Sequence, residues 1–267
     1  MRLLFYIILA CFNLFCIEAF AQRYATPIDP AGIEVPMYLG ATIGFGQNFQ
    51  NGSMYVDCAN CEFLNGNKFN FTAGIYLERQ LFEGGYLGFD ALFSAGGLNS
   101  SFKENEIVEV NDQVSNFREN VTIPFRHTAD LKISDFSFVP YVKYEPFSFM
   151  YLKFGVSYNS NLSATLTHTK ELLIREVTLS NGVITKVELA NTKGAKAIVQ
   201  DGDYKELEKS YFALNPTIGL NIPFGETNSV IFSPWLTYVL PLSNMATNSN
   251  DFKINKWHLM LSLGFKL

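Results

Sequence analysis

The sequence has few charged residues and, beyond its N-terminus, no long apolar run. Charged residues make up 17% of its 267 residues, whereas soluble domains typically contain about 25%. No later stretch reaches the 18 or more apolar residues that a membrane helix requires. The chain is nevertheless rich in aromatic residues, with 25 Phe and 13 Tyr. Apolar content without long apolar runs predicts short alternating segments, which are typical of β-strands.

The chain also lacks a basic patch. Its formal net charge is −5, and no stripe of Lys or Arg alternates with aromatic residues along it. A nucleic-acid partner is therefore not expected.

The N-terminus has the features of an export signal. Arg2 supplies the positive start, residues 3–15 form an apolar core, and Ala19-Phe20-Ala21 matches an A-x-A cleavage site. We expect residues 1–21 to be a signal peptide and residues 22–35 a periplasmic N-terminal segment. A membrane anchor is the alternative, but Glu18 ends the apolar run early. A lipid attachment at Cys11 would leave a very short apolar core before it.

Only two of the four cysteines remain once the signal is removed. Cys58 and Cys61 form a Cys-Ala-Asn-Cys motif, and in an oxidising compartment we expect a disulfide between them. A zinc site would need two more ligands, and none is close in the sequence. A thioredoxin-like motif would open a helix beside a βαβ unit, whereas the surroundings here are rich in Gly and Asn. We therefore expect no metal and no cofactor.

Eight segments alternate apolar residues with polar or small ones. In the last, Trp257 and every second residue to Leu267 are apolar, while His258 and its alternates are mostly polar or small. Each segment is about as long as a tilted strand needs to cross a bilayer, which is about 9–11 residues. Tyr144, Tyr158, Tyr238 and Trp257 point outward and are expected at the membrane interfaces. The segments are 37–47, 68–81, 86–95, 132–145, 149–159, 211–223, 229–240 and 257–267.

The connections between these segments alternate in length. Short ones lie at 83–85, around Pro146 and at 225–228, and long ones at 50–67, 97–130, 160–210 and 241–253. A soluble sandwich also alternates apolar and polar residues, but nothing in that fold requires short and long loops to alternate along the chain. Outer-membrane barrels have short periplasmic turns and long extracellular loops.

The expected fold is therefore all-β: a closed antiparallel transmembrane β-barrel of about eight strands over residues 36–267, in the outer membrane of a Gram-negative bacterium. Residues 172–189 contain a hairpin around Ser180-Asn181-Gly182. If that hairpin joined the wall, the barrel would have ten strands. Pro140, Pro216 and Pro234 lie within expected strands and predict bulges or the membrane boundary.

The pattern resembles a known family. The alternating strands, the Gly-rich first strand, Leu-Gly-Phe-Asp at 87–90 and Leu-Ser-Leu-Gly-Phe-Lys-Leu at 261–267 are similar to the outer-membrane β-barrel domains of Bacteroidetes, of the PorT-like type. They resemble the OmpA-type eight-stranded barrel more distantly. The resemblance spans most of the mature chain. PorT-like membership implies a part in a secretion or motility assembly.

Charged residues are expected on the inward faces of the strands. Charges inside a narrow barrel must pair or meet water, and an eight-stranded barrel leaves room only for side chains or one small ligand. We expect an ion-pair network that fills the lumen. A small pore or a carrier for a small solute is the alternative. The expected network consists of Glu78, Asp90, Lys143, Glu145, Lys153 and Lys266, with His258 on the same inward side.

No catalytic constellation is evident. His127 and His168 fall in expected loops, where a histidine is usually solvated, and no spacing ties them to Ser101, Asp130 or Ser163. We therefore expect a protein that is not an enzyme. Function on such barrels usually resides in loops held by a rigid scaffold. The expected partners are outer-membrane lipid and a membrane or secretion-machinery protein bound by the long loops.

Overall fold

A computed structural model describes residues 36–56, 61–111, 118–189, 194–225, 229–249 and 251–267. The expected signal peptide and periplasmic segment lie outside these residues, as does Cys58. None of the described residues belongs to a helix with the length and apolar character needed to span a bilayer.

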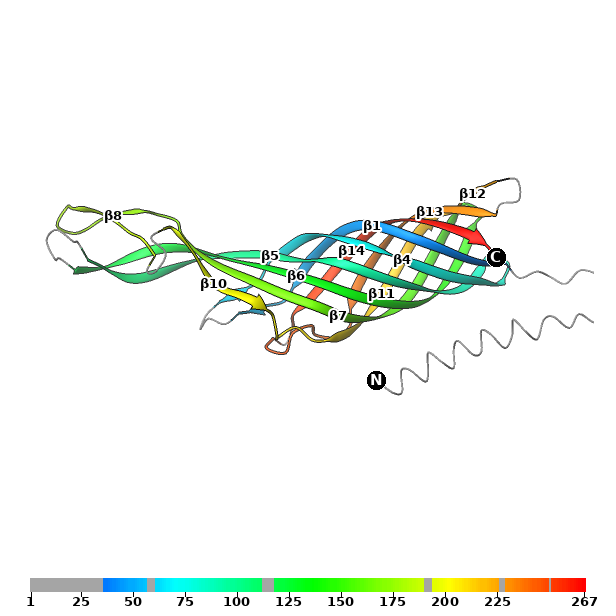
Figure 1. The fold of residues 1–267 in the computed structure, drawn as a ribbon, viewed down its shortest axis with the longest axis horizontal. Coiled ribbons are helices and arrows are strands. Elements are labelled where there is room, and N and C mark those ends of the chain that lie inside the picture. Colours follow the sequence, from blue (N-terminus) through cyan, green and yellow to red (C-terminus); the bar gives the residue numbers. More distant parts are fainter. Residues whose placement is uncertain (1–35, 57–60, 112–117, 190–193, 226–228, 250) are drawn as a thin grey trace, which may run out of the picture. The chain divides into compact units, whose positions relative to one another are not determined.

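In the part of the chain that the structure describes, eight antiparallel strands close into a ring (Figure 1). Each strand pairs with the next along the ring, β1 pairs with β14, and β6 pairs with β7. The closed eight-stranded antiparallel barrel expected from the alternation is therefore confirmed. The ring strands are β1 (Met37–Asn51), β4 (Gly66–Phe82), β5 (Gly85–Asn111), β6 (Arg118–Phe147), β7 (Met150–Leu172), β11 (Ser210–Leu220), β13 (Val230–Pro241) and β14 (Lys253–Lys266).

The wall carries apolar side chains outside and polar or small ones inside. Leu39, Ile43 and Phe45 of β1 are exposed, whereas Thr42 between them is buried. The ring exposes Leu, Ile, Val and Phe on nearly all strands, which is the reverse of a soluble core. Aromatic pairs lie on this outer face, including Tyr158 with Phe212, whose ring centroids are 5.5 Å apart. Such a surface is stable only in lipid.

The polarity of both faces reverses along β6. Its outward residues are apolar at Val142 and Phe136, then polar or charged from Ser134 through Lys132 to Arg126. Its inward residues are charged at Lys143 and then apolar beyond the lipid-facing band, where they face other apolar side chains. The strand therefore leaves the bilayer near Phe136 and continues in water.

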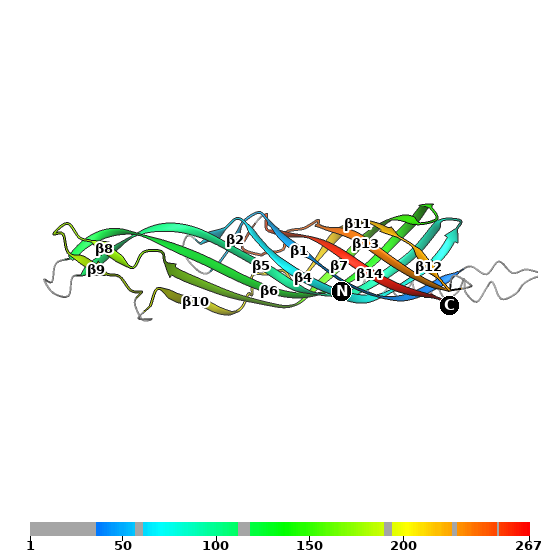
Figure 2. The ribbon, with the colours of Figure 1, turned by 90° about the horizontal axis from the view of Figure 1, so that it is seen from above.

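Two segments that were expected to be loops are mostly β-strand. Residues 97–130 continue β5 and β6, which stay paired from Gly85–Tyr144 to Asn111–Arg118. β7 extends to Leu172, and β10 (Lys196–Asp203) pairs with its extension. We call the paired parts beyond the bilayer the blade: residues 101–111, 118–131, 163–172 and 196–203. At about 3.4 Å per residue, the 13 steps from Leu131 to Arg118 give the blade's part of β6 a contour length of about 44 Å. Figures 1 and 2 show these strands running beyond the ring.

The predicted hairpin forms but stays out of the wall. β8 (Glu176–Thr178) and β9 (Ile184–Lys186) make their own two-stranded sheet, with Gly182 at φ +81° in the turn. Val177 and Leu179 are buried in one apolar cluster with Phe125 and Leu172 of the blade. The ten-strand alternative is therefore wrong. Three shorter strands complete the fold: β2 (Met54–Tyr55), β3 (Glu62–Phe63) and β12 (Ile222–Phe224).

The three prolines do not shift the register, but each interrupts the ladder on one side: Pro140 has no partner across β6–β7, and Pro216 and Pro234 have none across β11–β13. Pro140 lies opposite Phe89, Pro216 opposite Phe154 and Pro234 opposite Leu261 in continuous register. The wall's register shifts lie elsewhere, between Gln80 and Phe82 and twice in β6. The expectation of bulges at these prolines is therefore wrong.

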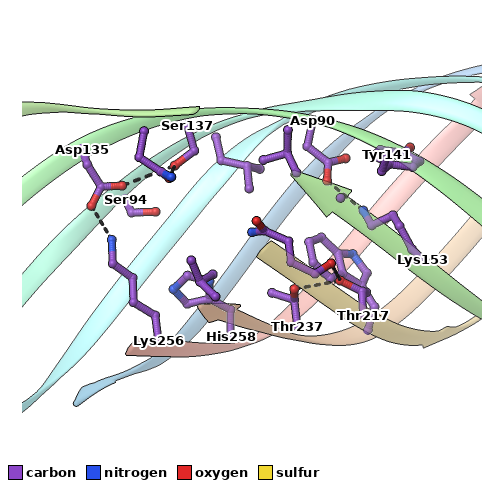
Figure 3. Close-up of a pocket in the computed structure, with 17 residues that line it drawn as sticks. Asp90, Ser94, Asp135, Ser137, Tyr141, Lys153, Thr217, Thr237, Lys256 and His258 are labelled. Atoms are coloured by element: carbon purple, nitrogen blue, oxygen red, sulfur yellow. Dashed lines mark hydrogen bonds and ion pairs between the residues drawn. The ribbon is translucent and has the colours of Figure 1, made fainter. Parts of the chain in front are cut away.

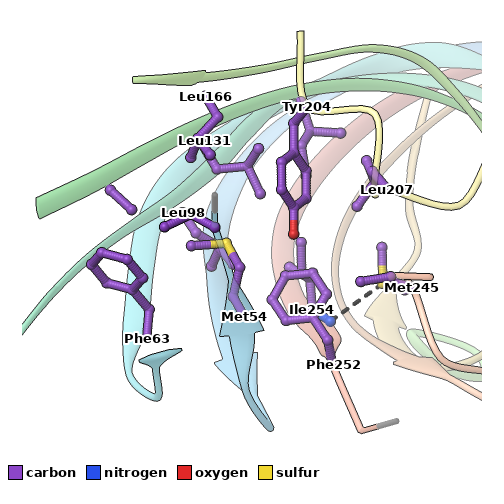
Figure 4. Close-up of a cluster of buried hydrophobic side chains, with 14 of the residues drawn as sticks. Met54, Phe63, Leu98, Leu131, Leu166, Tyr204, Leu207, Met245, Phe252 and Ile254 are labelled. Atoms are coloured by element: carbon purple, nitrogen blue, oxygen red, sulfur yellow. Dashed lines mark hydrogen bonds between the residues drawn. The ribbon is translucent and has the colours of Figure 1, made fainter. Parts of the chain in front are cut away.

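An apolar cap closes the outer end of the ring (Figure 4). The segments between ring strands send Met54, Phe63 and Phe252 inward, and all three are fully buried. The Tyr204 hydroxyl donates a hydrogen bond of 3.1 Å to the Tyr55 carbonyl, which joins two of these segments. The cap is composed of Met54, Phe63, Leu98, Leu131, Leu166, Tyr204, Leu207, Met245, Phe252 and Ile254, with further buried apolar neighbours.

Candidate functional site

The lumen is the first candidate, and large aromatic side chains fill much of it. Tyr76 lies where a side chain on Gly40 or Gly264 would have to fit, and Tyr151 occupies the same kind of space over Gly219. Only glycine permits these rings to approach the neighbouring strands so closely. Gly40, Gly219 and Gly264 therefore serve to accommodate tyrosines.

An ion-pair group occupies the periplasmic half of the lumen. Lys143 Nζ lies 2.6 Å from Glu78 and 3.2 Å from Glu145. The Tyr141 hydroxyl donates to the second oxygen of Glu78 at 3.1 Å. The Asn221 amide donates to Glu145 at 2.5 Å. Glu78 and Lys143 are almost fully buried, so these bonds replace lost hydration.

A second ion pair lies in the middle of the lumen (Figure 3). Lys153 donates to Asp90 at 2.7 Å, and both are buried. The Lys153 ammonium lies 4.2 Å from the ring centroids of both Tyr141 and Trp235. Trp235 donates its indole N–H to Ser262 at 2.6 Å, and its buried side chain lies on the inward side of β13.

The sequence interpretation missed a third ion pair. Lys256 of β14 donates to Asp135 of β6 at 2.5 Å, and both are buried. Asp135 precedes the outward Phe136, so strand alternation alone could have placed it inside. Lys256 lies one residue before the start expected for its strand. Lys266, in contrast, is exposed at the end of β14, and no described carboxylate lies within ion-pair distance of it.

Little free space remains around these groups. Two cavities lie among these groups, and each has room of about 20 Å³ for the centre of a water molecule. A single water needs about 10–15 Å³ on that measure. Each of these two cavities therefore accommodates only one or two isolated waters.

The second candidate lies where the blade meets the ring. His127 of β6 and His168 of β7 are both buried, and His127 Nδ1 lies 3.0 Å from His168 Nε2. Burial lowers the pKa of both imidazoles, that of His168 to about 4. The expectation of solvated loop histidines is therefore wrong, because the loops that were to carry them are strands.

Cys61 lies against this histidine pair. Its sulfur is 3.8 Å from His127 Nδ1, and Cys61 takes part in a disulfide. The expected partner, Cys58, lies outside the described residues. No ligand for Cys61 was near in the sequence, but pairing of β6 with β7 brings two histidines to it. Only the register of β6 against β7 would have indicated that the two histidines lie beside Cys61.

The residues considered for catalysis do not assemble. Asp130 pairs with Lys68 at 2.5 Å, and Ser163 hydrogen-bonds Ser134 at 2.6 Å. Ser101 is exposed on the blade. Among the described residues, no serine lies within hydrogen-bond distance of His127 or His168. Their nearest carboxylate, Glu106, is 3.7 Å from His127 and binds Lys170 instead.

Comparisons with known proteins give only distant likenesses. No protein-family model matches the chain, and no curated protein matches it. The attachment invasion locus protein Ail of Yersinia pestis, solved with the heparin analogue sucrose octasulfate, has 11% identity and a TM-score of 0.31; the match covers 86% of this chain and 99% of Ail. Neisserial surface protein A has 10% identity and a TM-score of 0.35, with 86% and 97% covered. OprG of Pseudomonas aeruginosa has 10% identity and a TM-score of 0.40, with 85% and 95% covered.

These values carry no role across to this chain, so its class rests on its own pairing and surface. Eight antiparallel strands close without an edge, and their outer face is apolar. A closed barrel satisfies its backbone hydrogen bonds internally, as a bilayer requires. The chain is an eight-stranded transmembrane β-barrel.

Proposed function

We propose that this chain is a non-enzymatic surface protein whose blade binds a protein partner outside the membrane. The observation that carries the proposal is the continuation of β5, β6 and β7 well beyond the lipid-facing band as an ordered sheet. A barrel that served only as a membrane anchor would not need this extension.

The filled lumen supports a function outside the barrel. Three lysines are paired with carboxylates inside it, and the apolar cap covers its outer end. Transport would require breaking buried ion pairs, and removing one partner of such a pair costs about 3–5 kcal/mol.

The blade presents two open strand edges. Beyond Ser100, β5 pairs only with β6, and β10 pairs only with β7 among the described residues. An open edge offers unpaired backbone N–H and C=O groups to which another chain can add a strand. Ile107 on β5 and Ile198 on β10 project apolar side chains into solvent there, 76% and 65% exposed. Together these features favour a protein partner over a small solute.

The kind of partner follows from the resemblance to PorT-like barrels. We propose a component of a secretion or motility assembly that meets this barrel at the outer membrane. Supporting features are the Gly-rich first strand and the terminal 261–267 segment. They are features of pattern, so partner identification is the appropriate test.

The test is a crosslinking pull-down from outer membranes with a shortened blade. Ile107 and Thr122 face each other across the hairpin, so an Asn-Gly turn joining them should preserve the register below. The full chain should yield a reproducible partner that the shortened chain loses. Equal recovery from both, with the barrel folded in each, would overturn the proposal.

A small pore or carrier remains the competing function. The filled lumen predicts no discrete conductance steps when the purified barrel is placed in a planar bilayer. Steps that change on charge reversal at Lys153 would favour a pore instead.

A further inference from the structure

The proposed partner binding at the blade edges does not use the buried cluster of Cys61, His127 and His168. Three elements far apart in sequence bring it together: the segment leading into β3, strand β6 and strand β7. We propose that Cys61, His127 and His168 form a Zn²⁺ site when Cys61 is a thiol, and that the disulfide at Cys61 closes the site.

The spacing of the donor atoms suits a single ion. One ligand atom from each residue lies within 4.8 Å of the other two, with 3.0 Å between the two nitrogens and 3.8 Å from sulfur to His127 Nδ1. Zn–N bonds of about 2.0–2.1 Å and a Zn–S bond of about 2.3 Å in a tetrahedron place two nitrogens about 3.3 Å apart and sulfur about 3.6 Å from nitrogen. Small side-chain shifts are enough to admit the ion.

The chemistry of the donors suits zinc as well. Thiolate and imidazole are the ligands that Zn²⁺ prefers, and three protein ligands leave a fourth position for water. Metal binding requires neutral imidazoles, and both histidines are buried among other side chains.

The surroundings hold the donors in place. Phe102 stacks on His127 with centroids 4.9 Å apart, and Phe63 meets His168 edge-on at 5.7 Å. Glu106 lies 3.7 Å from His127 Nε2, the nitrogen that faces away from the cluster. A carboxylate behind a ligating imidazole is the usual outer partner of a metal site. His127 Nε2 has no hydrogen-bond partner among the described residues, so metal binding would let it donate to that carboxylate.

The redox state decides whether sulfur can take part, because the thiolate is the ligand. Two thiol molecules reduce the disulfide: each loses one electron and one proton, they become one external disulfide, and two cysteine thiols form. Cys61 then gives up its remaining proton when it binds the ion. Reoxidation reverses these steps and expels the ion.

The test uses the full mature barrel in detergent with Co²⁺ as a spectroscopic substitute for Zn²⁺. The Cys58→Ser variant leaves Cys61 as a thiol if Cys58 is its disulfide partner. It should bind one Co²⁺, with a thiolate-to-cobalt charge-transfer band and the intense visible bands of a tetrahedral ion. Competition with Zn²⁺ should abolish these bands. Oxidised wild type should show none of them.

Ligand and control variants complete the test. In the Cys58→Ser background, His127→Gln or His168→Gln should weaken Co²⁺ binding more than about a hundredfold, because loss of an outer partner alone costs about 10–100-fold. His258→Gln removes the remaining histidine, which lies in the lumen, and should leave binding unchanged.

Two results would overturn the proposal: no cobalt spectrum from a folded Cys58→Ser barrel, or binding that survives loss of either cluster histidine. If Cys58→Ser fails to fold, wild type can be folded first and then reduced with a phosphine. The same two measurements are then made: the cobalt spectrum, and its loss when either cluster histidine is replaced. In that case the phosphine takes oxygen from water and supplies the disulfide with two electrons.

Discussion

The buried pair of Lys153 and Asp90 gives the sharpest test of the filled lumen. The pair is 2.7 Å long, and its side chains are 8% and 4% exposed. At an effective dielectric constant of about 20, two unit charges at that distance attract by about 6 kcal/mol before desolvation is counted. Lys153→Met leaves Asp90 without its ion-pair partner, so we expect a loss of about 3–5 kcal/mol in the free energy of unfolding.

A double-mutant cycle isolates the interaction. Asp90→Leu alone should cost about as much as Lys153→Met, because it leaves Lys153 without its carboxylate. The double variant should lie within about 1–2 kcal/mol of wild type, because apolar replacement of both partners is often neutral. Lys266→Met is the matched control, since Lys266 is exposed, and it should shift stability by less than about 0.5 kcal/mol.

The assay is urea unfolding in lipid vesicles, followed by Trp fluorescence and by gel mobility. Trp235 contacts Lys153 directly, so it reports on the site itself. A cost below about 1 kcal/mol for both single variants, with no coupling, would refute a dry lumen and indicate that water solvates these charges.

Three further predictions test other parts of the molecule. Leu261→Arg places a charge on the lipid-facing wall, opposite Ile43 and Pro234, and should lower stability by about 2–4 kcal/mol; an unchanged unfolding midpoint would show that this face does not meet lipid. Gly219→Val forces a side chain against the Tyr151 ring and should cost about 1–3 kcal/mol, whereas Ser101→Val, at an exposed position of the blade, should leave the barrel's unfolding midpoint unchanged; equal destabilisation by both would contradict the packing. Burial lowers the pKa of His168 from its ordinary value of about 6.5 to about 4, so the unfolded form gains protons first as pH falls. Blade stability should therefore fall between about pH 6.5 and 4, measured as faster hydrogen exchange in β6 and β7, and His168→Phe should reduce that dependence.

The alternation of residues was enough to predict the wall. A face that meets lipid must be apolar at every second residue, so Leu39, Ile43 and Phe45 identify β1 on their own. The same rule places Glu78, Asp90, Lys143 and Lys153 inside. It does not say which acid meets which lysine, because that depends on register between strands.

The blade escaped prediction because its polarity is reversed. Outward positions such as Lys132 and Arg126 are charged, and inward positions such as Leu131 and Phe125 are apolar. Because the outward positions are polar, such a segment does not match the pattern of a membrane strand, and it resembles a polar loop. The charged residues of 97–130 were therefore interpreted as connection rather than as strand in water.

The histidine cluster depends on contacts that no local pattern contains. His127 and His168 are 41 residues apart, and Cys61 precedes His127 by 66. Each residue by itself looks like an ordinary polar position. Only the antiparallel pairing of β6 with β7, and the return of the 61–65 segment over the mouth of the ring, bring them together.

Photo-crosslinking in living cells tests most directly whether function lies on the blade. A photoreactive residue at position 107 replaces Ile107, which is 76% exposed on the open edge of β5. The matched position is 83, where Glu83 is exposed in the periplasmic turn between β4 and β5. We predict a discrete protein adduct from position 107 and none from position 83. Adducts from position 83 alone, or from neither position with both barrels folded, would contradict a partner bound at the cell surface.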